Sequence, residues 1–176
     1  MWQYFLKDGL SLVVLDNAGD NEVDSCDVVG VSLNLDASTE VTGLENCELP
    51  ESVVRINDDV ENPVKNALLQ NGGKWVDFKF VAVSNSVGNQ QERTNILNLM
   101  ENELIKLAKS MSYSGIITVS SHVATQEIEE KIYGYDVRNV LHVSSYTMQN
   151  SDGENIQPFK HAPADYSLKC LVKLIT

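Results

Sequence analysis

The sequence has few cysteine and histidine residues, and their spacing excludes several classes of site. The three cysteines, Cys26, Cys47 and Cys170, form no Cys-x-x-Cys pair, which predicts reduced thiols in a cytoplasmic protein rather than a disulfide framework. The three histidines show neither a His-Glu-x-x-His motif nor paired-ligand spacing, so we expect no metal site. A Gly-x-x-x-x-Gly-Lys-Ser/Thr loop and a Gly-x-Ser-x-Gly elbow are also absent. Nucleotide hydrolysis and serine-hydrolase chemistry therefore have no support.

Long apolar runs and basic stretches are missing as well. No segment approaches the roughly 20 apolar residues that span a bilayer, and the first eight residues are too short and too acidic to be a secretory signal. The 13 basic and 25 acidic side chains give a formal net charge of −12, without a stripe of Lys and Arg. We therefore expect neither nucleic-acid nor membrane binding, and an attraction for cations instead.

The 176 residues, 43% of them hydrophobic, predict one α/β domain spanning 1–176. β-Branched or alternating segments predict strands over 10–15, 28–34, 75–83, 115–119, 137–146 and 167–175. Apolar residues at helical spacing from Ile96 to Met111 predict the strongest helix, after a polar loop over 84–95. Other helices are expected to open at Pro50, to cover 63–70 before Gly72-Gly73, and to cover 124–132. The chain starts almost directly in a strand-like segment.

The order of these elements resembles that of the GNAT superfamily of acetyl-CoA-dependent N-acetyltransferases, and more closely its insect arylalkylamine N-acetyltransferase-like branch. The resemblance is best over 96–146, where 96–110, 113–115 and 131–137 are similar to the family's helix, strand and Gly-Tyr corner. Segments 8–12, 29–34 and 158–174 resemble its second, third and C-terminal strands. The resemblance implies an α/β (α+β) fold in which a mixed, mostly antiparallel central sheet is flanked by helices.

The resemblance also implies an acetyl-CoA site at the loop that leads into the long helix. The family holds the pantetheine amides on a strand and the pyrophosphate on a helix N-terminus. Its [RQ]-x-x-G-x-[GA] pattern uses small residues so that the backbone approaches the phosphates closely. One register here puts Glu92 in the first slot and the other puts Gln91 there, and neither supplies a glycine. The expected cofactor-binding residues are Val81, Val83, Gln91, Arg93, Thr94, Asn95 and Ile96.

A simpler interpretation of 84–97 is a solvated surface loop followed by a helix that packs on the core. The missing glycines favour this interpretation, and so does Glu92, which one register places beside a pyrophosphate. Arg93, Lys106 and Lys109 are the cations that would contact phosphates if a cofactor binds.

Amine acetylation needs a base that removes the proton of the amine and an acid for the departing thiolate. In the insect branch the base is a glutamate upstream of the segment that begins here at Asp8, so we expect a domain short of its first strand and helices and assign no base. Two family hydroxyls match Ser121 and Thr125, which would bind the amine or the thiol. Ser121 as a helix N-cap is the alternative. His161 resembles the family's C-terminal Pro-His region and is expected near the acceptor amine.

The sequence therefore supports two main functions. The first is an acetyl-CoA-dependent N-acetyltransferase that acts on a small primary amine of the arylalkylamine type, cytoplasmic and monomeric or weakly dimeric. The second is a degenerate GNAT-fold protein without transferase activity, which acts as a ligand-binding or vestigial module. The missing glutamate and the missing loop glycines favour this second function. An unrelated small-ligand or protein-interaction α/β domain is a third.

Overall fold

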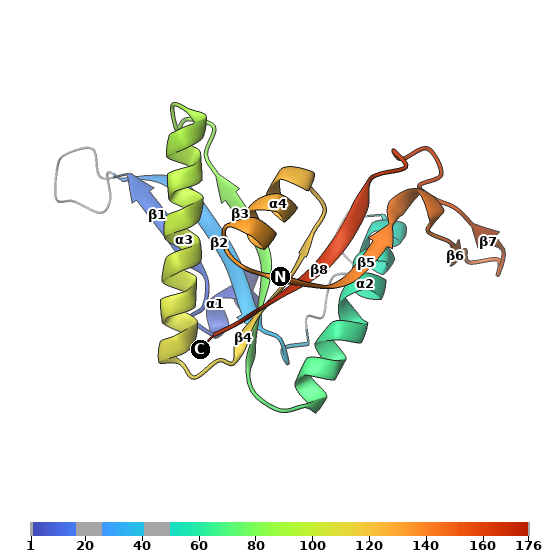
Figure 1. Ribbon diagram of the computed structural model, residues 1–176, viewed down its shortest axis with the longest axis horizontal. Helices are drawn as coiled ribbons and strands as arrows, with labels where there is room; N and C mark the ends of the chain where they lie inside the picture. Colours follow the sequence, from blue (N-terminus) through green and yellow to red (C-terminus); the bar gives the residue numbers. More distant parts are fainter. Residues whose placement is uncertain (1, 17–25, 41–49, 176) are drawn as a thin grey trace. The chain divides into compact units, whose positions relative to one another are not determined.

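The computed structural model describes residues 2–16, 26–40 and 50–175, and the chain divides into two compact units (Figure 1). The first unit comprises residues 1–42, 74–115 and 175–176, and the second comprises 43–73 and 116–174. Within the described ranges, the strand order is β1-β2-β3 in the first unit and β4-β8-β5 in the second. The fold is the mixed, mostly antiparallel α/β class that the sequence predicted, whereas the prediction of one domain over 1–176 stays a prediction.

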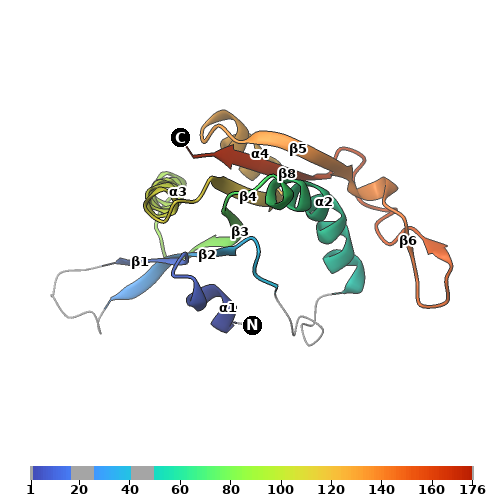
Figure 2. The same cartoon turned by 90° about the horizontal axis from the view of Figure 1, so that it is seen from below.

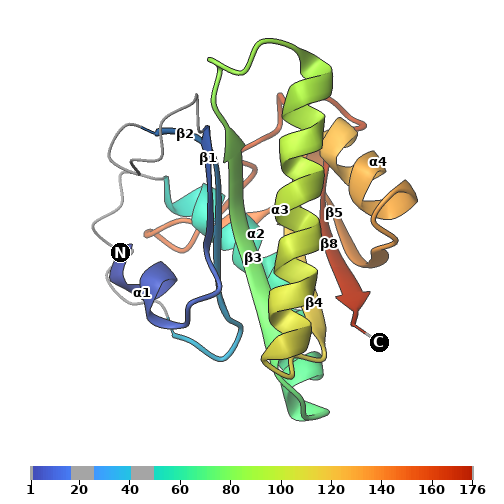
Figure 3. The same cartoon turned by 90° about the vertical axis from the view of Figure 1, so that its left-hand side faces the viewer.

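The first unit is a three-stranded antiparallel sheet with a helix on each face. Its elements are α1 (Trp2–Lys7), β1 (Leu12–Asp16), β2 (Asp27–Asp36), β3 (Trp75–Val83) and α3 (Gln90–Ser110). Both strand pairs, β1 with β2 and β2 with β3, are antiparallel. Figure 2 shows α3 on one face of these strands and α1 on the other, and Figure 3 shows α3 running along them. Phe5 of α1 packs edge-on against Phe80 of β3, with ring centroids 6.2 Å apart.

Helix α3 approaches β2 closely because a glycine lies at the contact. A Cβ added to Gly30 would lie 2.8 Å from Ile96 Cγ2 and 3.3 Å from Met100 Sδ. Ile96 and Met100 are one helical turn apart, so the helix presents both side chains to the same stretch of backbone. The apolar spacing that predicted this helix therefore does mark its buried face, and Gly30 leaves the room that the face needs.

The second unit contains α2 (Glu51–Gln70), β4 (Gly115–Ser120), α4 (Val123–Lys131), β5 (Asp136–His142) and β8 (Ser167–Leu174). A 3₁₀ turn, Val143–Ser145, follows β5, and β6 (Met148–Gln149) with β7 (Asn155–Ile156) forms a separate hairpin. β5 and β8 pair antiparallel, and Figure 2 shows α2 and α4 on opposite sides of them. Asn139 of β5 donates its amide to the carbonyl of Val60 in α2 at 2.9 Å, which fastens this helix to the strand.

Most strand predictions are confirmed to within about two residues, but four boundaries were wrong. Residues 51–70 form one helix with Pro63 inside it, rather than two helices. Helix α3 begins at Gln90, six residues before Ile96, because Asn89 caps it there. β5 ends at His142, where the 3₁₀ turn begins, and does not continue to Tyr146. The first described residues form α1 instead of a strand-like segment. Residues 17–25, which follow β1, and residues 41–49 lie outside the described residues.

Candidate functional site

A pocket of about 440 Å³ lies in the first unit, where the loop before α3 meets the ends of β1 and β2. Its apolar walls come from β1, β2, the loop and the first turns of α3, and the exposed carboxylates of Asp16 and Glu92 also line it. Of the predicted cofactor-binding residues, Asn95 and Ile96 are part of the lining. The full lining is Leu15, Asp16, Val29, Ser86, Val87, Gly88, Glu92, Asn95 and Ile96.

The N-terminus of α3 is capped by its own loop. The side-chain oxygen of Asn89 accepts a hydrogen bond from the backbone N–H of Glu92 at 2.9 Å, as in a helix-capping box. The carboxylate of Glu92 lies over the loop's single glycine, since its Oε2 would be 3.3 Å from a Cβ placed on Gly88. A negative side chain in the first turn also complements the positive end of the helix dipole. The chain itself thus supplies the anion that this helix end favours.

The side chain of Arg93 forms hydrogen bonds with the backbone of the loop before α3. Its Nε donates to the carbonyl of Val87 at 3.1 Å, and its Nη2 donates to the carbonyl of Asn85 at 3.2 Å. Two guanidinium hydrogen bonds to neighbouring carbonyls fix both the loop and the side chain. The cation nearest to the helix N-terminus in sequence is therefore already committed to the backbone of its own loop.

The other residues predicted for this site also bond within the chain. Thr94 Oγ1 donates to the carbonyl of Gln90 at 2.9 Å, and the amide of Gln91 donates to Asn95 Oδ1 at 3.0 Å. Val81 and Val83 lie in β3 opposite Ser32 and Gly30 of β2. Because cross-strand partners share a face of the sheet, Val83 is on the face that carries α3. Neither valine lines the pocket.

These contacts do not fit a pyrophosphate at the start of α3. Polyphosphate binding at a helix end needs free backbone N–H groups and positive charge nearby. Here Asn89 takes the Glu92 N–H, Glu92 brings a carboxylate to the same place, and Arg93 points into the loop. The geometry matches the simpler interpretation of residues 84–97, a self-contained surface loop followed by a core-packing helix.

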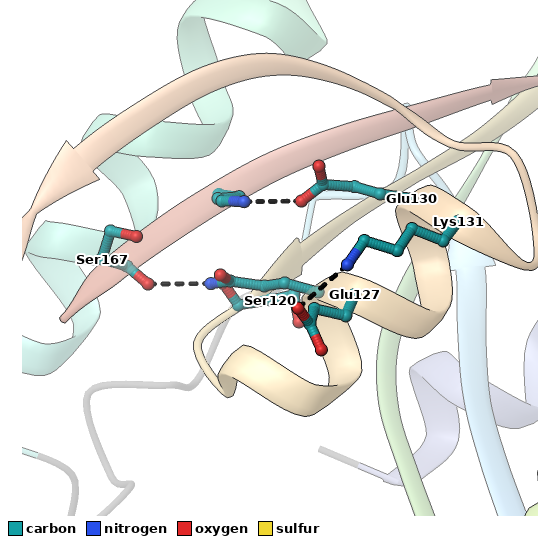
Figure 4. A network of polar contacts seen from close by, with 7 residues as sticks. Ser120, Glu127, Glu130, Lys131 and Ser167 are labelled. Atoms are coloured by element: carbon teal, nitrogen blue, oxygen red, sulfur yellow. Dashed lines mark hydrogen bonds and ion pairs between the residues drawn. The ribbon is translucent and has the colours of Figure 1, made fainter. Parts of the chain in front are cut away.

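The second unit holds the predicted hydroxyls, and Figure 4 shows a network of polar contacts around α4. Ser121 is exposed just before the helix, and Thr125 is half-buried in its first turn. The N-cap of α4 is His122, without a side-chain cap bond, so the alternative role of Ser121 as N-cap is wrong. Next to Thr125, the buried Gln126 donates to the carbonyls of Ser120 and Ser167, both at 2.9 Å. Gln126 thereby ties the start of α4 to the ends of β4 and β8.

Two ion pairs involve residues of the same helix. Lys169 of β8 bonds Glu130 at 2.5 Å, and Lys131 bonds Glu127 one turn back at 3.0 Å. Glu130 is thus the partner of a lysine. Ser120, at the end of β4, is buried, and its Oγ has no hydrogen-bond partner in the described structure. A hydroxyl left in this way is unusual in a protein interior.

His161 lies in the turn between β7 and β8 and is exposed. It belongs to the second unit together with Ser121 and Thr125, but no hydrogen bond joins it to either of them. Among the described residues, no group of three or more His, Cys, Asp or Glu side chains is placed to hold a metal ion. No described helix is both long enough and apolar enough to cross a bilayer.

Two tyrosines carry shifted pKa values away from these sites. Burial, and then a 2.7 Å hydrogen bond to Asp59, raises the pKa of Tyr146 to about 12. Burial and a 3.0 Å bond to Asp36 raise the pKa of Tyr113 above its usual value. Burial by itself raises the pKa of Asp36, but the hydrogen bonds from Ser38 and Tyr113 and the charge of Lys74 together outweigh it, so the net pKa is lowered. Both pairs join separate segments, which indicates a structural role.

The sequence prediction missed Asn89 as the start of α3, although the signal was present. Asn89-Gln90-Gln91-Glu92 is the pattern of a capping box, a polar N-cap followed three residues later by Glu. It also missed Asp16 and Val29 as pocket residues. No local pattern identifies these two, because the antiparallel pairing of β1 with β2 brings them together.

The comparisons with known proteins identify the fold. No family model matches the chain. The chain is 26% identical over 163 residues to the beta-alanyl-bioamine nonribosomal peptide synthetase ebony of Drosophila melanogaster, a match that covers 93% of the chain and 17% of that protein. The chain thus spans about a sixth of the length of this curated relative.

Two solved structures carry the likeness further. The C-terminal condensation domain of Ebony in complex with beta-alanyl-dopamine superposes with a TM-score of 0.79 at 23% identity, over 99% of this chain and 76% of that one. The mosquito protein arylalkylamine N-acetyltransferase like 5b superposes with a TM-score of 0.63 at 18% identity, over 94% of this chain and 74% of that one. The chain has the fold of the GNAT N-acetyltransferases, which confirms the resemblance seen in the sequence.

Proposed function

We propose that this chain is an acyl-transfer domain that joins an acyl group to the amino group of a small aromatic amine. The likeness over 93% of the chain to a beta-alanyl-bioamine synthetase carries the proposal. The structural neighbours support it, because one is a condensation domain in complex with beta-alanyl-dopamine and the other an arylalkylamine N-acetyltransferase. A net charge of −12 favours the approach of a cationic amine.

The reaction exchanges a thioester for an amide. The neutral amine attacks the acyl carbonyl, the C–N bond forms as the C–S bond breaks, and the proton lost by the amine ends on the released thiol. Ser121 and Thr125, four residues apart at the start of α4, are the proposed hydroxyls that hydrogen-bond the amine or the thiol. Gln126 holds this helix start through the carbonyls of Ser120 and Ser167. His161 is the proposed contact for the amine substrate.

A second candidate is an N-acetyltransferase that uses acetyl-CoA. The likeness to an arylalkylamine N-acetyltransferase favours it, and the cofactor would then meet the residues predicted at β3 and α3. The capped start of α3 weighs against this candidate. A GNAT-fold module without transferase activity is the remaining alternative, and the same experiment separates it from both enzymes.

The test measures amide formation directly. The chain is incubated with dopamine, tyramine or tryptamine and with acetyl or β-alanyl thioesters, and the amide is detected by mass spectrometry. We expect product with at least one thioester. Because each 1.4 kcal/mol lost from transition-state binding is tenfold in rate, Ser121→Ala or Thr125→Val is expected to lower kcat/KM by about tenfold or more.

Ser145→Ala is the matched control, since this exposed hydroxyl of the second unit bonds only the carbonyl of His142. We expect it to leave kcat/KM within about twofold of the parent value. Absence of amide with every donor would overturn the proposal and favour the inactive module. Full activity in both hydroxyl variants would remove Ser121 and Thr125 from the reaction.

A further inference from the structure

We infer that the donor site of this chain does not bind the nucleotide half of coenzyme A, so that its acyl donor is a pantetheine-type thioester without a polyphosphate. The inference rests on the proposed acyl transfer and names the class of donor. Three features of the first unit carry it: the capped start of α3, the acidic pocket beside that start, and the position of the nearby cations.

The first feature is the hydrogen bonding at the start of α3. A helix end binds a pyrophosphate through the N–H groups of its first turn. The N–H of Glu92 is taken by Asn89 Oδ1 at 2.9 Å, and the N–H of Arg93 makes the ordinary helical bond to the carbonyl of Asn89 at 3.1 Å, so the first turn offers a ligand the N–H groups of Gln90 and Gln91 only. A phosphate oxygen would have to displace the Asn89 side chain to reach the Glu92 N–H.

The second feature is the charge around the loop. Gly88 is the one residue of 84–89 without a side chain, and so the place where a phosphate could approach the backbone closely. The Glu92 carboxylate covers it. Asp16, from the end of β1, lines the same pocket. A polyphosphate here would meet two like charges at short range, which disfavours binding.

The third feature is that the cations lie elsewhere. Arg93 donates from Nε and Nη2 to the carbonyls of Val87 and Asn85, so freeing it would unbrace the loop. Lys106 bonds Glu103 at 2.6 Å, and at 1.5 Å per residue it lies roughly 24 Å along the axis from Gln90. Lys109 is one turn further on. Neither lysine can neutralise a phosphate at the start of the helix.

The pantetheine arm is not subject to these restrictions, because it is uncharged and carries amides. A donor whose arm has no nucleotide needs neither free N–H groups nor cations at the start of α3. A loop that binds no phosphate needs no small residues at the two positions where the family has them, which accounts for Asn95 and Leu97 in one register, or Thr94 and Ile96 in the other.

The first experiment compares donors that differ only in the nucleotide. Amide formation with dopamine is measured with acetyl-CoA against acetyl-pantetheine, and with β-alanyl-CoA against β-alanyl-pantetheine. We expect kcat/KM for each CoA thioester to be no higher than for its pantetheine counterpart, and 3′-phospho-ADP at about 1 mM to leave the rate unchanged. A tenfold preference for the CoA thioesters, or inhibition by 3′-phospho-ADP, would overturn the inference.

A binding measurement separates this inference from the proposed function. Calorimetric titration with CoA and with pantetheine needs no turnover. If no donor yields amide, the proposed function fails. The donor inference is tested separately by the titration, because tighter binding of CoA than of pantetheine would overturn it. Binding of CoA that is equal to or weaker than binding of pantetheine would uphold the inference, whereas absence of binding by both compounds would overturn the assignment of a pantetheine-type donor.

A paired variant tests the cause. Asn89→Gly with Glu92→Gln frees the N–H, removes the charge and keeps the helix start, because glycine is a fair N-cap. We expect its affinity for CoA to rise about fivefold or more, as expected when a like charge near the ligand is removed, with pantetheine binding unchanged.

Glu103→Gln is the matched control, since it makes the same charge change on the same helix, three turns away from the pocket. We expect it to leave both affinities unchanged. Thermal melting of each variant confirms folding. An unchanged CoA affinity in a folded Asn89→Gly/Glu92→Gln variant would show that these residues do not exclude the nucleotide.

Discussion

Tyr146 shows how one side chain secures a segment that has little secondary structure. It follows the 3₁₀ turn after β5, and its hydroxyl donates to the Asp59 carboxylate of α2 at 2.7 Å. Its ring is buried and lies 6.3 Å, between centroids, from that of Phe159. The contact thus joins α2, the end of β5 and the segment that leads to β8, all within the second unit.

We expect Tyr146→Phe to lower the free energy of unfolding by about 1 kcal/mol at pH 7, the usual net value of a hydrogen bond. The pKa of Tyr146 is raised to about 12 in the folded chain, against about 10 in the unfolded chain. The tyrosine therefore contributes its full stabilisation below pH 10 and loses it as the pH rises from about 10 to 12. Urea unfolding of the parent chain and of Tyr146→Phe at pH 7 and pH 11 measures the difference between their free energies of unfolding. Tyr166→Phe serves as the control. A difference in free energy of unfolding that is as large at pH 11 as at pH 7 would contradict this role of the Tyr146 hydroxyl.

At the same scale, the sequence predicted part of the candidate site. Asn95 and Ile96, two of the residues predicted near the start of the long helix, line the pocket. The sequence could not show that Arg93 turns back to its own loop, since an arginine reaches either way and only the fold of residues 84–89 decides. Asp16 joins the pocket through strand pairing, which no local pattern records.

At the scale of elements, α2 is the least expected feature. It runs over 20 residues, with Pro63 twelve residues after its start. A proline inside a helix lacks the N–H that would bond the residue four positions earlier, and its ring crowds that carbonyl. Packing of the apolar face, including the buried Ile56 and Val60, and the bond from Asn139 compensate for this cost.

We expect Pro63→Ala to raise the free energy of unfolding by about 1–3 kcal/mol, because alanine restores a helical hydrogen bond and removes the clash. If the chain instead formed two helices with Pro63 in the first turn of the second, the same change would be neutral or destabilising. Urea unfolding and far-ultraviolet circular dichroism measure the effect. Pro163→Ala, in the loop before β8, is the control and is expected to give no increase.

The strands were easier to predict than the ends of the helices. β3, β4 and β8 have apolar or alternating runs bounded by polar residues, and their limits follow directly from the sequence. The helix ends depend on single side chains, such as Asn89, and on tolerance of Pro63, which packing decides. The end of β5 at His142 depends on the 3₁₀ turn, and this turn has no signal in the alternating residues before it.

For the whole molecule, the dominant physical quantity is the charge of −12. The ion pairs at the surface, such as Lys131 with Glu127 and Arg55 with Glu51, are largely exposed and contribute little each. Repulsion among the remaining carboxylates therefore opposes the compact state.

We expect the melting temperature to rise by about 2–4 °C, or about 1 kcal/mol, when NaCl is raised from about 0.02 M to about 0.5 M, because salt screens this repulsion. Differential scanning fluorimetry measures it. MgCl₂ and CaCl₂ at matched ionic strength are expected to act like NaCl. A markedly larger rise with either divalent ion would instead point to a specific cation site.

The glycine at position 30 has a consequence for reading relatives of this chain. Helix α3 rests on bare backbone there, and residues 84–89 continue straight into that helix. A relative with a bulkier residue at this position needs either smaller side chains than Ile96 and Met100 at the contact or a helix that lies further from the sheet. The residues aligned with Gly30, Ile96 and Met100, considered together, therefore indicate whether a relative keeps the close approach of α3 to β2.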